Sequence, residues 1–146
     1  MKKVFALALL TTGLLFTSVN TEAQTSGELK TADGIAFDTV SNTATTKYLY
    51  TPEVSGLYKV ASISLSADKV SGAVDGTATL EASNDGVSWY SYYDSKDSVY
   101  SYTLTDKSAQ GYRWQLYDVG DLKFRVKVVV SGTQVARITG YFRLRK

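Results

Sequence analysis

Apolar and polar residues alternate with a period of two along the C-terminal part of this chain. Every second residue from 122 to 130 is apolar, and residues 136–144 repeat the pattern. This period puts successive side chains on opposite faces of an extended chain, which is typical of β-strands with one buried face. Further runs of Tyr, Val and Thr recur upstream between turn residues, and no segment has a helical period. The pattern therefore predicts an all-β domain.

The spacing of these runs predicts about eight antiparallel strands in a single β-sandwich of the jelly-roll or immunoglobulin-like type. The candidate strands are 47–51, 57–67, 76–82, 87–93, 99–104, 111–117, 122–130 and 133–144. The predicted core consists of Ile63, Leu65, Leu80, Trp89, Trp114, Phe124, Val126, Val128, Ile138 and Phe142.

The first residues differ in character from the rest of the chain. Lys2 and Lys3 precede an apolar stretch over 4–16, and the segment ends on the small residue Ala23, which together predict a secretory signal peptide over residues 1–23. The apolar stretch is shorter than the roughly 20 residues that cross a bilayer, so no membrane span is expected after cleavage before Gln24. Retention of the segment in an assembly is the alternative.

Residues 24–46 are rich in Thr, Ser, Ala and Asp and contain few large apolar groups. They predict a flexible leader that holds at most one short strand, over 35–40. The β-sandwich domain is then expected to occupy residues 47–146.

The chain of 146 residues contains no His and no Cys. This composition excludes zinc sites built on those ligands, Ser-His and Cys-His nucleophilic pairs, haem and iron-sulfur ligation, and disulfides. We therefore expect no enzyme and no cofactor. Export without disulfides suggests an extracellular, periplasmic or surface location on a bacterium.

The last two strands carry the strongest register signal. Residues opposite each other in a hairpin share one face of the sheet, which favours a three-residue loop over 130–132. This loop would place Phe124 opposite Ile138 and Arg125 opposite Arg137.

Residues 122–146 include no acidic side chain. The expected hairpin would gather Lys123, Arg125, Lys127 and Arg137 into a basic face. Such a face could bind an anion, or it could protect the sheet against edge pairing. Nucleic acid is not an expected partner, because the basic stripe has no interleaved aromatic residues and the net charge is only +2.

A second hairpin is predicted at Asp85-Gly86, the residue pair that favours a type I′ turn. A two-residue loop would pair Ala82 with Trp89 on the core face. Tyr90 and Tyr92 would then be exposed on the other face.

Aromatic residues are concentrated between residues 89 and 117. Exposed rows of aromatic rings are a common binding face, and Tyr90, Tyr92, Tyr100 and Tyr102 are the candidate ligand-binding residues. The alternative is that these residues are simply strand formers with half-buried rings.

Aspartates recur in the expected loops, where oxygen-rich turns can hold calcium. Their spacing matches no calcium loop, and Asp is also an ordinary turn residue. We therefore predict turns here and no metal site.

Two resemblances accompany these patterns. The stretch over 80–89, LEASNDGVSW, resembles the strand-turn-strand element S-x-D-G-x-x-W of discoidin-type carbohydrate-binding domains and is similar to the Asp-box. The segments SGAVDGTATL, SNDGVSW, FRVKV, SGTQ and ITGYF, in this order, resemble small all-β proteins encoded among the virion structural genes of bacteriophages and prophages. The second resemblance implies a particle or surface component without catalysis.

The sequence thus predicts a non-catalytic, exported structural or adhesive β-sandwich module at a bacterial cell or virion surface. Its expected partners are further copies of itself or other surface or particle proteins. The alternative is a carbohydrate-binding module that binds glycans through an exposed Tyr/Trp face.

Overall fold

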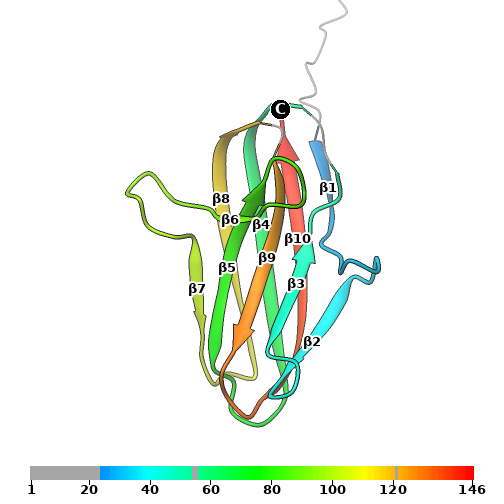
Figure 1. Ribbon diagram of the computed structural model, residues 1–146, viewed down its shortest axis with the longest axis vertical. Helices are drawn as coiled ribbons and strands as arrows, with labels where there is room; N and C mark the ends of the chain where they lie inside the picture. The colour runs from blue at the N-terminus through cyan, green and yellow to red at the C-terminus, as the bar shows by residue number, and fades with distance from the viewer. Residues whose placement is uncertain (1–23, 54–55, 121) are drawn as a thin grey trace, which may run out of the picture.

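A computed structural model of the chain describes residues 24–53, 56–120 and 122–146 (Figure 1). Within these residues it has ten strands and no helix. The strands are β1 (Gln24–Glu28), β2 (Phe37–Ser41), β3 (Thr46–Tyr50), β4 (Tyr58–Ser71), β5 (Gly76–Ser83), β6 (Tyr90–Ser91), β7 (Ser101–Leu104), β8 (Ala109–Val119), β9 (Lys123–Val130) and β10 (Val135–Arg145). The predicted signal peptide lies outside the described residues.

The strands form two five-stranded antiparallel sheets that lie one behind the other in Figure 1. In sheet A, β4 lies between β8 and β10, and β1 and β2 pair with the two halves of β10 on its other side. In sheet B, β9 lies between β3 and β5, and β6 and β7 pair with β5. The predicted all-β sandwich is confirmed.

Strand β4 shows why the sequence folds into two layers. Ala61, Ile63, Leu65 and Ala67 alternate with serines and are buried between the sheets. The inward faces of β9 and β10 are apolar in the same way. Burial of these alternating side chains on a shared core is the main stabilising contribution to the sandwich.

The segment predicted as a flexible leader is instead part of sheet A. Its residues form β1 and β2, and β2 overlaps the single short strand expected over 35–40. Leu29, which follows β1, is fully buried and donates its N–H to the carbonyl of Gly140 at 2.8 Å. A Cβ at Gly140 would lie 2.6 Å from Leu29 Cδ1, so the absence of a side chain there makes room for Leu29. This contact was not visible in the composition of the segment.

The predicted hairpin between the last two strands is wrong. Strand β9 pairs with β3 and β5 in sheet B, whereas β10 pairs with β1, β2 and β4 in sheet A. Residues 131–134 therefore cross from one sheet to the other, and Gln134 is buried at this crossing. Its amide accepts from the N–H of Asp75 at 3.0 Å and donates to the Asp75 carbonyl at 2.7 Å. Two strands that bury facing apolar sides have the same sequence pattern whether they pair in one sheet or face each other across the core.

The type I′ turn at Asp85-Gly86 is also wrong. The strands pair Ala82 with Tyr90, one residue away from the predicted partner Trp89, and only Gly86 of the two turn residues has a positive φ. The Asp85 carboxylate instead accepts bonds from the N–H groups of Val87 and Ser88, both at 2.8 Å. This side-chain capping favours a longer loop than the two-residue turn.

The predicted core is buried except for Trp89, which the altered loop leaves half-buried beside Arg125. The part of the chain that the structure describes contains no helix with the length and apolar character to cross a bilayer.

Candidate functional site

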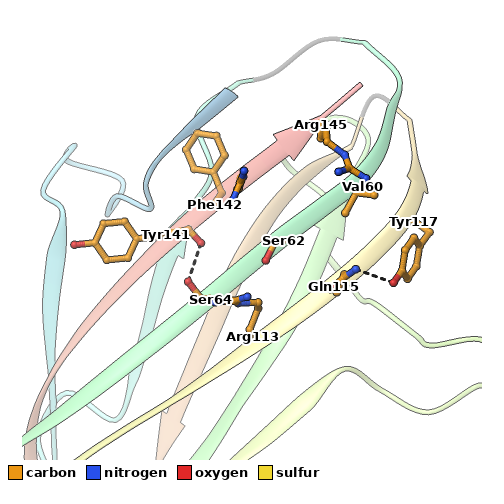
Figure 2. A pocket seen from close by; sticks show the side chains of 10 residues that line it. Val60, Ser62, Ser64, Arg113, Gln115, Tyr117, Tyr141, Phe142 and Arg145 are labelled. Atoms are coloured by element: carbon orange, nitrogen blue, oxygen red, sulfur yellow. Dashed lines mark hydrogen bonds between the residues drawn. The ribbon is translucent and has the colours of Figure 1, made fainter. Parts of the chain in front are cut away.

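The outer face of sheet A carries an open groove with a volume of about 430 Å³. Its floor is β4, and its two walls are β8 and β10 (Figure 2). Because the three strands are paired in register, the outward residues form three cross-strand rows. The rows, read from β8 through β4 to β10, are Tyr117–Val60–Arg145, Gln115–Ser62–Arg143 and Arg113–Ser64–Tyr141. We call these nine residues the sheet A groove.

The floor of the sheet A groove is low because β4 places small side chains there. Ser62 and Ser64 lie between longer side chains on both neighbouring strands, so the walls rise above them. The Ser64 hydroxyl donates to the carbonyl of Tyr141 at 3.3 Å. A hydroxyl also accepts hydrogen bonds, so the floor offers polar contacts to a bound molecule.

Tyrosine rings stand at diagonal corners of the sheet A groove. Tyr117 is 63% exposed and Tyr141 is 53% exposed. The amide nitrogen of Gln115 donates to the Tyr117 hydroxyl at 2.7 Å, which fixes the position of that ring (Figure 2). One exposed tyrosine therefore stands at each wall of the groove.

The charge of the sheet A groove is positive. Arg113 projects from β8, while Arg143 and Arg145 project from β10, and none of the described residues that line the groove is acidic. Arg143 Nη2 donates to the neutral amide oxygen of Gln24 at 2.7 Å. The described lining of the groove thus holds three guanidinium groups and no carboxylate.

The hollow continues past the third row. A second depression shares Ser64 and Arg113 with the sheet A groove and extends to Gly111 on β8. Gly111 lies opposite Ser66 in the next cross-strand row. The surface along β4 is therefore long enough for an extended ligand.

The four residues of the expected basic face do not lie together. Lys123, Arg125 and Lys127 project from β9 on the outer side of sheet B, whereas Arg137 lies on β10 in sheet A. Arg125 does not face Arg137, because the two residues lie in different sheets. Its guanidinium instead donates to Glu81 at 2.6 Å. The prediction of one four-residue basic face is wrong because it rested on the hairpin between these strands.

Arg125 is enclosed by aromatic rings as well as by its acidic partner. Its guanidinium carbon lies 4.2 Å from the ring centre of Tyr48 and 4.4 Å from that of Trp89. Lys127 also approaches Glu81, at 3.8 Å. The charges on this outer face are paired within the protein, which makes it a poor site for a charged ligand.

The four predicted ligand-binding tyrosines occupy different environments. Tyr90 is exposed, as expected. Tyr92 is not exposed on the outer face: it packs on the core, 5.7 Å from Phe124 between ring centres, and stacks on Tyr100 at 5.7 Å. Tyr102 also packs against the core. The structure therefore does not bring the four rings together as an open binding face.

The hydroxyl of Tyr100 reflects this packing. Burial raises its pKa above the usual tyrosine value, with a smaller contribution from the charge of Asp94. The hydroxyl donates to the Gln115 carbonyl at 3.3 Å. Tyr100 thus contacts the backbone of β8 and does not line the sheet A groove.

Several aspartates could have suggested a calcium site. In the structure they accept backbone hydrogen bonds in loops instead. The N–H groups of Ser98 and Lys96 bind the Asp94 carboxylate and lower its pKa. The ammonium group of Lys69 and the N–H of Val74 both bind the Asp106 carboxylate and lower its pKa. Over the described ranges, no three acidic side chains come together as in a metal site.

Sequence reasoning did not find the sheet A groove. One signal was present: serine occupies the three alternate positions 62, 64 and 66 between apolar residues, in a strand long enough to cross the sheet centre. Small polar residues on a central strand mark a low floor when the flanking strands carry long side chains. The neighbours of β4 could not be identified without the topology.

Comparisons with known proteins give only distant similarity. No protein-family model matches the chain, and no curated protein matches it. Among solved structures, an arabinose-bound α-L-arabinofuranosidase, MgGH51, has a TM-score of 0.44 at 12% identity over 80% of this chain, which spans 24% of that protein. The CBM22-1 xylan-binding domain of Paenibacillus barcinonensis Xyn10C has a TM-score of 0.40 at 13% identity over 86% of this chain and 97% of that domain. These similarities are too distant to indicate a function.

Proposed function

We propose that this protein is a non-catalytic carbohydrate-binding module and that its site is the sheet A groove. One observation carries the proposal: the exposed rings of Tyr117 and Tyr141 stand diagonally across a floor of serine hydroxyls. The proposal takes up the alternative from the sequence analysis, a glycan ligand, and moves its site to another face.

The chemistry of a sugar matches these surfaces. A pyranose ring has C–H faces that stack on aromatic rings and a rim of hydroxyls that need hydrogen-bond partners. Tyr117 and Tyr141 offer the stacking surfaces, and Ser62, Ser64 and Gln115 offer the polar contacts. A concave surface that combines aromatic and polar groups in this way is typical of small-molecule and glycan sites.

The separation of the two tyrosines favours a chain of sugars over a single sugar. Four residues of β4 separate their rows, which is about 14 Å along the strand, and two strand spacings add about 10 Å across the sheet. One pyranose ring cannot reach both tyrosines at this spacing. An oligosaccharide that crosses the groove obliquely can contact both.

Binding without bond cleavage suits the residues present. A glycosidase of the usual kind needs two carboxyl groups on opposite sides of the scissile bond. The described lining of the sheet A groove has arginine, serine, glutamine and tyrosine, but no carboxyl group.

The proposal is tested by paired tyrosine variants on a panel of immobilised neutral and acidic polysaccharides. Tyr117→Ala with Tyr141→Ala should abolish binding to the polysaccharide that the parent protein retains. The matched control is Tyr90→Ala with Tyr93→Ala, which removes two rings that are 70% and 55% exposed outside the groove. Retained binding in the first variant, or loss in the control alone, would overturn the placement of the site.

A structural or adhesive role is the second candidate, and the open edge of β8 favours it. Among the described residues, this eleven-residue strand pairs only with β4, so its outer edge can accept another strand. A second copy of the chain, or another surface or particle protein, is the expected partner. Light scattering at high protein concentration should then detect a defined oligomer, and a strictly monomeric protein would count against self-association.

A further inference from the structure

We infer that the ligand of the sheet A groove is an acidic polysaccharide, whose carboxylate or sulfate groups bind to Arg113 and Arg143. This inference rests on the proposed function and adds the charge of the ligand to it. Neither the sequence patterns nor the tyrosine geometry specifies that charge.

The arginines are distributed along the whole groove. Each of the three cross-strand rows contains one of them: Arg145 is in the row of Tyr117, Arg143 in that of Gln115, and Arg113 in that of Tyr141. Adjacent rows are about 7 Å apart along the strands. A polymer with a repeated negative charge can therefore meet a guanidinium group at successive positions, on both walls.

Two of these arginines, Arg113 and Arg143, have no carboxylate beside them in the described lining of the groove. The Arg143 side chain binds the uncharged amide of Gln24. Like charges on one sheet face repel each other, so the proximity of these guanidinium groups has an electrostatic cost. An anionic ligand removes this cost and gains charge-assisted hydrogen bonds, for which the planar guanidinium is well suited.

Other features of the groove favour a glycan over a nucleic acid as the anion. The serine floor suits a ligand rich in hydroxyl groups. The charge of the chain as a whole is nearly balanced, with 16 basic and 14 acidic residues and a pI of about 8.7. Domains that bind nucleic acid through their charge are usually more basic than this.

The first experiment compares polymers that differ only in charge. Binding of the parent protein is measured for polygalacturonate and its methyl ester, and for dextran sulfate and dextran. We expect binding to one or both acidic polymers, weakened by added salt, and much weaker binding to the neutral forms. The two acidic arms distinguish carboxylate from sulfate as the group that is recognised.

The second experiment assigns the binding to the groove. Arg113→Gln with Arg143→Gln should weaken binding to the acidic polymer by about tenfold for each arginine, because each removes a charge-assisted hydrogen bond. The matched control is Lys96→Gln with Lys107→Gln, which removes two exposed charges from loops outside the groove. The control should bind like the parent protein.

The outcomes separate the two proposals. Equal binding of neutral and acidic forms would overturn the acidic ligand and leave the carbohydrate-binding function standing. Failure to bind any polysaccharide in the panel would overturn both. An equal loss in the lysine control would show unspecific attraction by net charge. Tighter binding of an oligothymidylate than of either acidic polymer would replace the glycan with a nucleic acid.

Discussion

The outer faces of the two sheets both carry arginines and aromatic residues, but these residues are paired with each other on sheet B and surround an open groove on sheet A. On sheet B, Arg125 lies between Tyr48 and Trp89 and is bonded to Glu81. On sheet A, arginines and tyrosines surround a hollow. The difference lies in the residue opposite the arginine on the neighbouring strand: Glu81 faces Arg125, whereas Ser62 faces Arg143.

This comparison shows what converts a set of strand residues into a site. A carboxylate in register with arginine closes the face, because the pair satisfies both charges and draws the aromatic rings together. A serine at the equivalent position leaves both the charge and the space above it available. Aromatic and basic composition alone therefore does not distinguish a binding face from an internally paired one.

The largest effect is expected from breaking the Glu81–Arg125 ion pair on the outer face of sheet B. Glu81→Gln removes the charge from a side chain that is 9% exposed and leaves Arg125, which is 15% exposed, without its anion. Breaking a buried pair from one side is costly, so we expect a loss of about 3 kcal/mol in the free energy of unfolding. Urea unfolding measures it. A loss below about 0.5 kcal/mol, typical of surface substitutions, would mean that the pair does not hold this face.

The reverse change introduces a carboxylate into the sheet A groove and should block ligand binding there. Ser62→Glu places a carboxylate opposite Arg143, as Glu81 stands opposite Arg125. Binding of the acidic polymer should fall about tenfold or more, because the ligand must displace an internal anion and meets a like charge. Ser62→Gln is the control for size. If both variants bind equally weakly, steric blocking and not charge explains the loss.

The contrast between the faces also explains how far the sequence could predict this protein. The alternation in β4, β9 and β10 was enough to predict strands, buried faces and an antiparallel sandwich. It was not enough to predict that β9 and β10 belong to different sheets, because both arrangements bury the same residues. Residues 24–46 were judged by composition, which missed the docking of Leu29 on Gly140.

The site was harder to predict than the fold for the same reason. The sheet A groove depends on which strands flank β4 and in which register, and residues from all three strands are far apart in sequence. The aromatic cluster drew attention to Tyr92, Tyr100 and Tyr102, whose rings pack on the core. Only the serine repeat in β4 indicated the groove. It could not be interpreted without knowing that β8 and β10 flank this strand.

A smaller effect is expected from changing the shape of a charge while keeping its sign. Arg125→Lys retains a cation for Glu81 but loses the planar group between Tyr48 and Trp89. We expect a loss of about 1 kcal/mol in unfolding free energy. Arg143→Lys on sheet A is the matched change and should leave stability nearly unaltered. Equal losses in both variants would remove the distinction between the two faces.

The smallest effect concerns the loop that carries Trp89, and it depends on pH. Bonds from the N–H groups of Val87 and Ser88 and from the Ser83 hydroxyl hold the pKa of Asp85 well below its usual range. A carboxyl whose pKa is lower in the folded than in the unfolded protein stabilises the fold at pH values above its unfolded pKa of about 4, and this contribution is lost as the pH falls through the folded pKa.

Asp85→Asn should therefore be less stable than the parent protein at neutral pH, and the difference should shrink as the pH is lowered below about 4. The variant shares the pKa shifts of Asp94 and Asp106 with the parent, so the difference between the two proteins isolates Asp85. The indole N–H of Trp89 donates to the Gly86 carbonyl at 3.2 Å, so the NMR signal of this N–H follows the loop directly while urea unfolding follows the whole domain. A stability difference that stays constant into the acid range would show that the Asp85 charge does not hold the loop, and that Trp89 is kept over Arg125 by ring packing alone.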